Sequence, residues 1–258
     1  MRDQSALCPA VSRQGAREVV IETLGSENNL KYRAWIERNR DHVARMSDGR
    51  VGYAYVPDTG RRGANDLRRQ FENARQFDAL IVDERWNGGG QSPYPFVRMV
   101  SQPVVNYWTH QNQLEMDWGP DFGRPGPVCL LVNESAGSGG DSFPYIFRQL
   151  GAGKLIGTRT WGGLVGISGN PGLIDGGYCS VPTFAFVDLD GSWGIEGYGV
   201  APDIEVVDDP ALMVDGGDPQ LDAAIRHMLD ELTRHPIRHP DQPAFPNRSG
   251  MGVPEKDW

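Results

Sequence analysis

Two continuous apolar runs, each leading into a polar loop, constrain the fold of this chain most strongly. They lie in "DALIVDERWNGGG" at residues 78–90 and in "GPVCLLVNE" at residues 126–134. A strand that is buried on both faces reads as an unbroken apolar run, and such strands are typical of parallel sheets. Apolar residues also recur at helical spacing, as in "NDLRRQFENARQF" at 65–77. The sequence therefore predicts an α/β fold whose parallel sheet is covered by helices.

The other elements are predicted from the same periodicities and from turn and capping residues. The polar first fifteen residues carry no pattern, and the residues after His235 are rich in proline, so both ends are expected to lack regular structure. The expected strands lie at 16–24, 49–58, 154–161 and 197–206, with a hairpin at 177–193. The expected helices lie at 27–46, from Ser138 to about 150, and from Pro219 to 234 with Asp218 as N-cap.

The composition argues against several classes of function. The 258 residues are 39% hydrophobic and suffice for one sizeable core. A formal charge of −9 without a basic cluster argues against a nucleic-acid partner. No signal peptide or membrane span is visible, and Cys8, Cys129 and Cys179 form neither a disulfide framework nor a C-x-x-C pair. A cytoplasmic protein with no membrane partner is therefore expected.

Ser138 is the candidate nucleophile. It lies in "NESAGSGGDSFPYIF" at residues 133–147, five residues after Asn133 and just before a predicted helix. A serine at a helix N-terminus lies in a positive field, and the amide of Gly139 is placed to face a developing oxyanion. Without further support, the same stretch indicates only a glycine turn with an N-cap.

The glycines 88–90 end the other buried strand. By themselves they also indicate only a turn. Because the carboxyl ends of parallel strands meet at one edge, where open α/β folds bind ligands, we expect this loop to lie beside Ser138. The two loops together predict an oxyanion site more strongly than either loop alone.

A serine nucleophile needs a base, and the sequence offers no clear one. None of the five histidines follows a predicted core strand, so a structural or solvated role is expected for each of them. Prolines 236 and 240 exclude the helix that would align two of these histidines for a metal, and we predict neither a metal site nor a cofactor. Among the lysines, only Lys154 could form a Ser-Lys dyad. The histidines are His42, His110, His227, His235 and His239.

Four blocks carry a resemblance to a known family. They read "GRVGYAYVPD", "LIVDERWNGGG", "VNESAGSGGDSFPYIFRQLGAGKLIGTRTWGGLVGI" and "WGIEGYGVAPDIEV", in that order within residues 16–215. Together they resemble the tail-specific, or C-terminal processing, serine peptidase superfamily, and specifically its tricorn branch. The resemblance implies a Clp-protease/crotonase-like parallel-sheet core and a peptidase that cleaves peptides through an acyl-enzyme.

The resemblance also implies roles for single residues. It makes Ser138 the nucleophile and Glu196 the acid that orients the base, although a strand-edge glutamate in solvent is an alternative for Glu196. It places the oxyanion hole at the Gly139 amide together with Gly88, or with Gly89 as second choice. In the processing branch a catalytic lysine follows the nucleophile. Gly163 stands at that place here, which argues against a Ser-Lys mechanism.

Tricorn-like enzymes carry the base, a histidine preceded by a serine, upstream of a PDZ domain. This chain begins at what resembles the last PDZ strand, so we expect the Ser-His pair to come from elsewhere and the chain alone to hydrolyse peptides poorly. We expect a leader and remnant PDZ strand at 1–25, a peptidase core at 26–215, a C-terminal helix at 216–234 and an extended or disordered tail at 235–258.

The expected partners are peptide substrates, with either further copies of this chain or a chain that carries the missing Ser-His segment. Two alternatives remain open at this point. The first is an α/β-hydrolase-type esterase, because Ser138, Asp203 and His227 follow the order of that triad. The second is a non-catalytic module that binds peptides or assembles with sister subunits.

Overall fold

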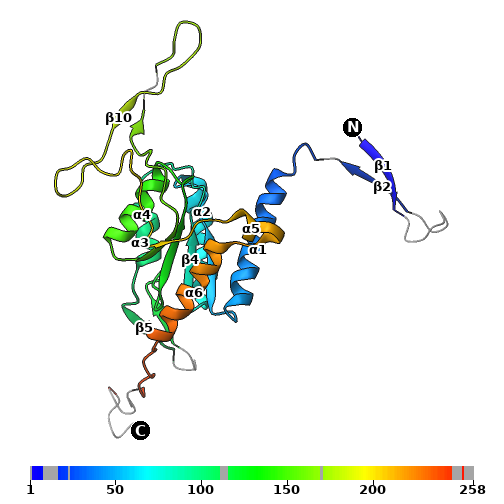
Figure 1. Ribbon diagram of the computed structural model, residues 1–258. Helices are drawn as coiled ribbons and strands as arrows, with labels where there is room; N and C mark the ends of the chain where they lie inside the picture. The colour runs from blue at the N-terminus through cyan, green and yellow to red at the C-terminus, as the bar shows by residue number, and fades with distance from the viewer. Residues whose placement is uncertain are drawn as a thin grey trace. The chain divides into compact units, whose positions relative to one another are not determined.

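The computed structural model describes residues 2–7, 17–22, 24–110, 116–168, 171–245 and 252 (Figure 1). The chain divides into two compact units at residue 39. In the first unit, β1 (Arg2–Leu7) pairs antiparallel with β2 (Arg17–Glu22), and most of α1 (Asn28–Met46) follows. The start of the chain was expected to lack structure, and β1 corrects that expectation. A lone strand leaves its backbone donors and acceptors unpaired, and β1 supplies their partners.

The second unit is built on the predicted parallel sheet, which is confirmed. Its strand order is β11-β8-β7-β4-β3, and each neighbouring pair is parallel. Parallel pairing places the loops that follow β3, β4 and β7 at one edge. The strands are β3 (Val51–Tyr55), β4 (Ala79–Asp83), β7 (Val128–Val132), β8 (Gly153–Gly157) and β11 (Ile204–Glu205).

Helices pack on both faces of this sheet. The helix α6 (Pro219–Arg234) packs against β3, β4, β7 and β8. On the other face, α2 (Arg61–Asn73), α3 (Tyr94–Ser101) and α4 (Gly139–Gln149) share one buried apolar cluster with strand residues such as Leu80 and Leu130. The remaining helices are η1 (Ala74–Gln76), α5 (Pro210–Met213) and η2 (Val214–Gly216). Among the described helices, none is long and apolar enough to cross a membrane.

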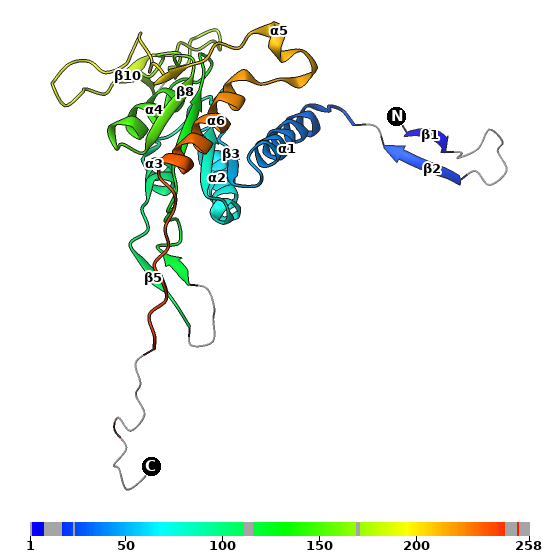
Figure 2. The same ribbon diagram turned by 60° about the horizontal axis from the view of Figure 1, so that its bottom comes forward.

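A long excursion at residues 164–198 leaves the sheet between β8 and β11, and we call it the arm. It reaches away from the sheet around β10, as Figures 1 and 2 show. The predicted hairpin at 177–193 is confirmed in its second half, where Val187 bridges Trp193 in antiparallel fashion and the Asp188 amide donates to the Ser192 carbonyl. Its first half differs, because β10 (Pro182–Phe184) pairs with β9 (Gly166–Ile167) outside the predicted range. The other small sheet joins β5 (Asn106–Trp108) to β6 (Asp117–Gly119).

The observed strands are shorter than the predicted ones, most clearly at β8 and β11. β8 ends at Gly157 because the chain then turns towards the loop after β7, where the Trp161 amide donates to the Ala136 carbonyl. β11 contains only Ile204–Glu205 of the predicted 197–206. The described part of the tail, 235–245, contains no helix or strand, and the rest of the tail lies outside the described residues except for residue 252.

Candidate active site

Ser138 stands at the N-terminus of α4 in an unusual backbone conformation. Its φ of 56° and ψ of −112° are rare for a residue other than glycine, and such strain persists only where the surroundings enforce it. The Ser138 amide is held twice, by the Gly163 carbonyl at 3.0 Å and by the Asp141 Oδ2 at 2.8 Å. The residue is half-buried. The fold thus fixes this serine at the carboxyl edge of the sheet while leaving it partly accessible.

The glycine loop after β4 lies directly against Ser138. A Cβ built on Gly89 would come within 2.6 Å of the Ser138 Cβ and 2.9 Å of the Gly139 nitrogen. Gly89 also has a φ of +82°, which favours glycine. The two strand-end loops therefore meet, as the order of the strands predicts, and only a glycine at position 89 permits this approach.

The hydrogen bonds of the glycine amides differ from the expected assignment. The Gly88 amide donates to the Pro57 carbonyl at 3.2 Å, and the Gly89 amide donates to the Asn87 Oδ1 at 2.9 Å. These two amides hold the loop in place, so neither is free for an oxyanion in this structure. Across the part of the chain that the structure describes, the Gly90 and Gly139 amides donate no hydrogen bond.

Asp141 is a residue whose importance to the site sequence reasoning missed. The sequence indicates it only as a residue of the first turn of α4. In the structure its Oδ2 accepts a hydrogen bond from the Ser138 amide at 2.8 Å, and its Oδ1 accepts one from the Gly162 amide at 2.7 Å. Burial raises its pKa above the ordinary range, against hydrogen bonds from Thr160 and from backbone amides that lower it. The spacing Ser-x-x-Asp is that of a capping box and was the available signal.

Glu196 binds the loop whose Gly163 carbonyl accepts a hydrogen bond from the Ser138 amide. Its Oε2 accepts hydrogen bonds from the Leu164 and Val165 amides, both at 2.7 Å. Leu164 follows Gly163, whose carbonyl binds the Ser138 amide. Glu196 is exposed to solvent and lines a pocket of about 490 Å³. The other residues of this pocket are mainly apolar: Leu164, Val165, Ala185, Phe186, Trp193, Gly194 and Tyr198.

The residues of the esterase alternative lie far from the nucleophile. His227, Asp203 and Lys154 line a cavity of about 360 Å³ together with residues at the amino ends of β7 and β8. Ser138 follows the carboxyl end of β7, so the two groups occupy opposite edges of the sheet. Burial lowers the pKa of His227. This placement contradicts a Ser138–Asp203–His227 triad and equally a dyad of Ser138 with Lys154.

The other histidines offer no base to Ser138 either. His42 Nε2 binds the Asp222 Oδ1 at 2.6 Å, and His239 Nδ1 lies 3.3 Å from the Tyr107 hydroxyl. His110 and His235 are exposed. Within the described residues, no histidine hydrogen bonds to Ser138.

The sequence of the core decides the family. The model of Peptidase family S41 matches residues 50–206, which include all five strands of the sheet and Ser138. The chain belongs to peptidase family S41.

Relatives of this S41 chain are similar over most of its length, and they place it in the tricorn branch, as predicted. The tricorn protease of Thermoplasma acidophilum is 39% identical over 228 residues, which are 88% of this chain and 21% of that protein. The putative tricorn-like protease C-terminal subunit of Sulfurisphaera tokodaii is 37% identical over 231 residues, 90% of this chain and 27% of that protein. The chain therefore spans about a fifth to a quarter of the length of these relatives.

Solved structures agree with the fold. The crystal structure of the tricorn protease matches with a TM-score of 0.80 and 39% identity, over 84% of this chain and 21% of that chain. A putative peptidase from Parabacteroides merdae matches with a TM-score of 0.56 at 22% identity, over 77% of this chain and 74% of that chain. The second likeness shows the fold alone.

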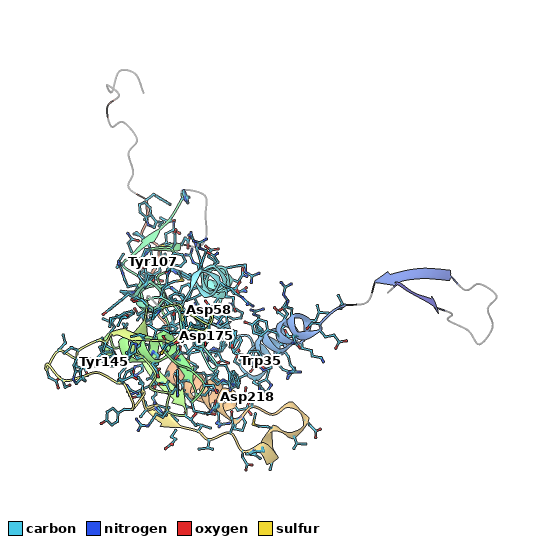
Figure 3. All side chains as sticks on the ribbon, turned by 90° about the horizontal axis from the view of Figure 1, so that it is seen from above. Trp35, Asp58, Tyr107, Tyr145, Asp175 and Asp218 are labelled. Carbon is cyan, nitrogen blue, oxygen red and sulfur yellow. The ribbon has the colours of Figure 1, made fainter. Side chains whose placement is uncertain are left out.

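A buried polar network lies behind the glycine loop of this S41 chain. Arg85 is 1% exposed and binds Asp83 and Asp218, each at 2.8 Å from its Nη2. Asp218, labelled in Figure 3, is also the N-cap of α6, so the network ties the loop to that helix. Asn87 binds the Gly89 amide with its side chain and the Gly137 amide with its carbonyl. These hydrogen bonds and ion pairs fix the backbone of the glycine loop beside Ser138.

Proposed function

We propose that this chain carries the nucleophile and the oxyanion site of a serine peptidase. The Ser138 Oγ bonds to the carbonyl carbon of a peptide, its proton passes to a base, and the carbonyl oxygen becomes the oxyanion. The C–N bond then breaks, the base returns the proton to the leaving amine, and water hydrolyses the acyl-enzyme. Family S41 membership supports this reaction class.

One observation carries the proposal. A half-buried serine at a helix N-terminus lies where two glycine loops meet. Within the described residues, each loop has an amide without a hydrogen bond, Gly139 in one and Gly90 in the other. Such amides stabilise an oxyanion in a site that is already organised. We assign the oxyanion to Gly139 and Gly90, since the Gly88 and Gly89 amides bind Pro57 and Asn87.

The base comes, in this proposal, from a histidine outside these 258 residues, on another segment of a longer protein or on a partner chain, since all five histidines of the sequence lie in its described part. The described histidines support it, because His42 and His239 bind other groups and His110 and His235 are exposed. His227 lies at the opposite edge of the sheet. Glu196 orients that base, and its hydrogen bonds from the Leu164 and Val165 amides, which follow Gly163, support this role. Because a missing base costs orders of magnitude in rate, we expect the chain alone to be weakly active.

We further propose that the substrates are peptides and that the chain works in an assembly in the cytoplasm. The apolar pocket beside Glu196 suits peptide side chains. The arm exposes large apolar side chains, including Ile167, Phe184 and Trp193, which are typical of surfaces that associate with protein. A relative named as a C-terminal subunit supports association with a further chain.

Covalent labelling by a fluorophosphonate probe tests the proposal. We expect an adduct on Ser138, located by mass spectrometry, in the assembly purified from cells and, more slowly, in the chain with added imidazole. Ser138→Ala should remove the adduct, and Ser142→Ala, a neighbouring serine on α4, should leave it unchanged. Failure to label Ser138 under both conditions would refute the peptidase and favour a non-catalytic peptide-binding module.

A further inference from the structure

A third strand-end loop borders the two glycine loops. It follows β3 and contains Thr59, whose amide donates to the Gly89 carbonyl at 2.9 Å. The preceding residue, Asp58 (Figure 3), caps α2 by accepting the Gly60 and Gly63 amides. The loop is therefore anchored on one side by a helix and on the other by the glycine loop. This places Thr59 at a fixed position behind the proposed oxyanion site.

The Thr59 hydroxyl lies against the two glycines whose amides are free. A Cβ on Gly139 would come within 2.0 Å of the Thr59 Oγ1 and 3.1 Å of the Gly90 nitrogen. A Cβ on Gly90 would come within 3.1 Å of the same Oγ1. The hydroxyl thus contacts the backbone of both residues that we assign to the oxyanion.

The hydroxyl is buried and makes no hydrogen bond. Thr59 is 2% exposed, and its Oγ1 has no partner within the described structure. Burying a hydroxyl without a partner is unfavourable, so packing alone would favour valine, which has the same shape. Oxygen, however, approaches a Cα to about 3.3 Å, whereas a methyl carbon needs about 3.5–4.0 Å. A hydroxyl therefore suits the close approach to Gly139 better than a methyl does.

We infer that Thr59 is a positioning residue for the proposed reaction, because its Oγ1 sets the spacing between the Gly90 and Gly139 amides. This inference rests on the proposed function. A valine methyl pushes Gly139 away from Gly90, and the two amides no longer converge on one oxygen. An intact peptide binds without the two amides converging on one oxygen. Thr59→Val should therefore weaken the binding of the tetrahedral state and not that of the intact peptide.

A tripeptide boronic acid tests the inference without turnover. It forms a tetrahedral adduct with a serine Oγ, and one boron-bound oxygen takes the place of the oxyanion. We expect Thr59→Val to weaken its binding about tenfold, less than the loss of an oxyanion donor costs. Thr59→Ser keeps the Oγ and should bind within about twofold of the parent protein. Affinities are measured by calorimetry, with the matching tripeptide acid as the ground-state control, which should not change.

The outcomes separate this inference from the proposed function. If the parent protein binds the boronic acid no better than Ser138→Ala does, the proposed function and the inference fail together. If the parent binds but Thr59→Val binds equally well, or Thr59→Ser is as weak as Thr59→Val, only the inference fails. Thermal unfolding of Thr59→Val should stay close to that of the parent protein, because removing an unpaired buried hydroxyl offsets the cost of displacing the backbone. Should that variant misfold, Thr59→Ala takes its place. It removes the Oγ1 that sets the spacing and puts no methyl there, so the two amides are no longer held at a fixed distance and a loss of about tenfold is again expected.

Discussion

The Ser138 amide donates a hydrogen bond of 2.8 Å to the Asp141 carboxylate, whose other oxygen binds the Gly162 amide at 2.7 Å. One buried side chain therefore holds the backbone of the candidate nucleophile and the loop that leads towards Glu196. The positive φ of Ser138 requires such support. Asp141 thus links the strained serine to the second part of the site.

Asp141→Asn should destabilise the protein and slow labelling of Ser138. An amide side chain has one oxygen, so its NH₂ group must face either the Ser138 amide, which keeps the Gly163 carbonyl, or the Gly162 amide, which is then left without an acceptor. A buried donor without a partner costs about 1–3 kcal/mol of unfolding free energy. Urea unfolding measures this loss, and Ser142→Ala, one residue along α4, is the control. Equal stability of the two variants would contradict the role of Asp141.

Gly89→Ala and Gly88→Ala should behave differently although the residues are adjacent. At Gly89 a Cβ meets the Ser138 Cβ at 2.6 Å and φ is +82°, whereas at Gly88 nothing lies within 4 Å. We expect Gly89→Ala to lose about 1–3 kcal/mol of stability and to abolish the boronic acid adduct. Gly88→Ala should retain both. Similar thermal unfolding of the two variants would mean that the loops do not meet at Ser138.

Glu196→Gln should affect chemistry more than stability. The side chain is exposed, so its hydrogen bonds to Leu164 and Val165 contribute little to folding. If Glu196 orients the base, fluorophosphonate labelling in the assembly should slow by about 10²–10⁴-fold. Asp190→Asn changes an exposed acid elsewhere on the arm and serves as the control. A labelling rate for Glu196→Gln equal to that of the control would favour the alternative of a solvated glutamate.

The sheet and the meeting of the two loops could be predicted because their signals are local. Unbroken apolar runs mark the strands, and parallel order alone brings the ends of β4 and β7 to one edge. The pairing of β9 with β10 has no such signal. Its partners are short and lie on either side of a long loop.

The sequence could not predict which glycine amides are free to bind an oxyanion and which already donate a hydrogen bond. Whether Gly88 or Gly90 has a free amide depends on the Pro57 carbonyl, about thirty residues away in the chain, which the fold brings to Gly88. The role of Asp141 depends in the same way on the Gly162 loop. Long-range hydrogen bonds of this kind follow from tertiary packing, whereas a sequence pattern specifies only that glycines are present.

Glu84 provides a prediction about pH. Its side chain is fully buried, accepts a hydrogen bond of 3.1 Å from the Asn87 Nδ2, and has no partner for its Oε1 within the described residues. Burial raises its pKa well above the ordinary value of 4.5. The folded protein therefore keeps this proton at pH values where the unfolded chain has lost it. This difference in proton binding contributes unfolding free energy that is fully present below pH 4.5 and is lost as pH rises through the folded-state pKa.

Glu84→Gln should remove this dependence, because glutamine stays neutral at every pH and can still accept from Asn87. The unfolding free energy of the variant, relative to the parent protein, should rise with pH above 4.5. Urea unfolding between about pH 5 and 9 measures the difference. Glu205→Gln, at an exposed position on β11, should give a curve parallel to that of the parent. If the curve of unfolding free energy against pH for Glu84→Gln is also parallel to that of the parent, the buried Glu84 carboxyl does not keep its proton in the folded protein.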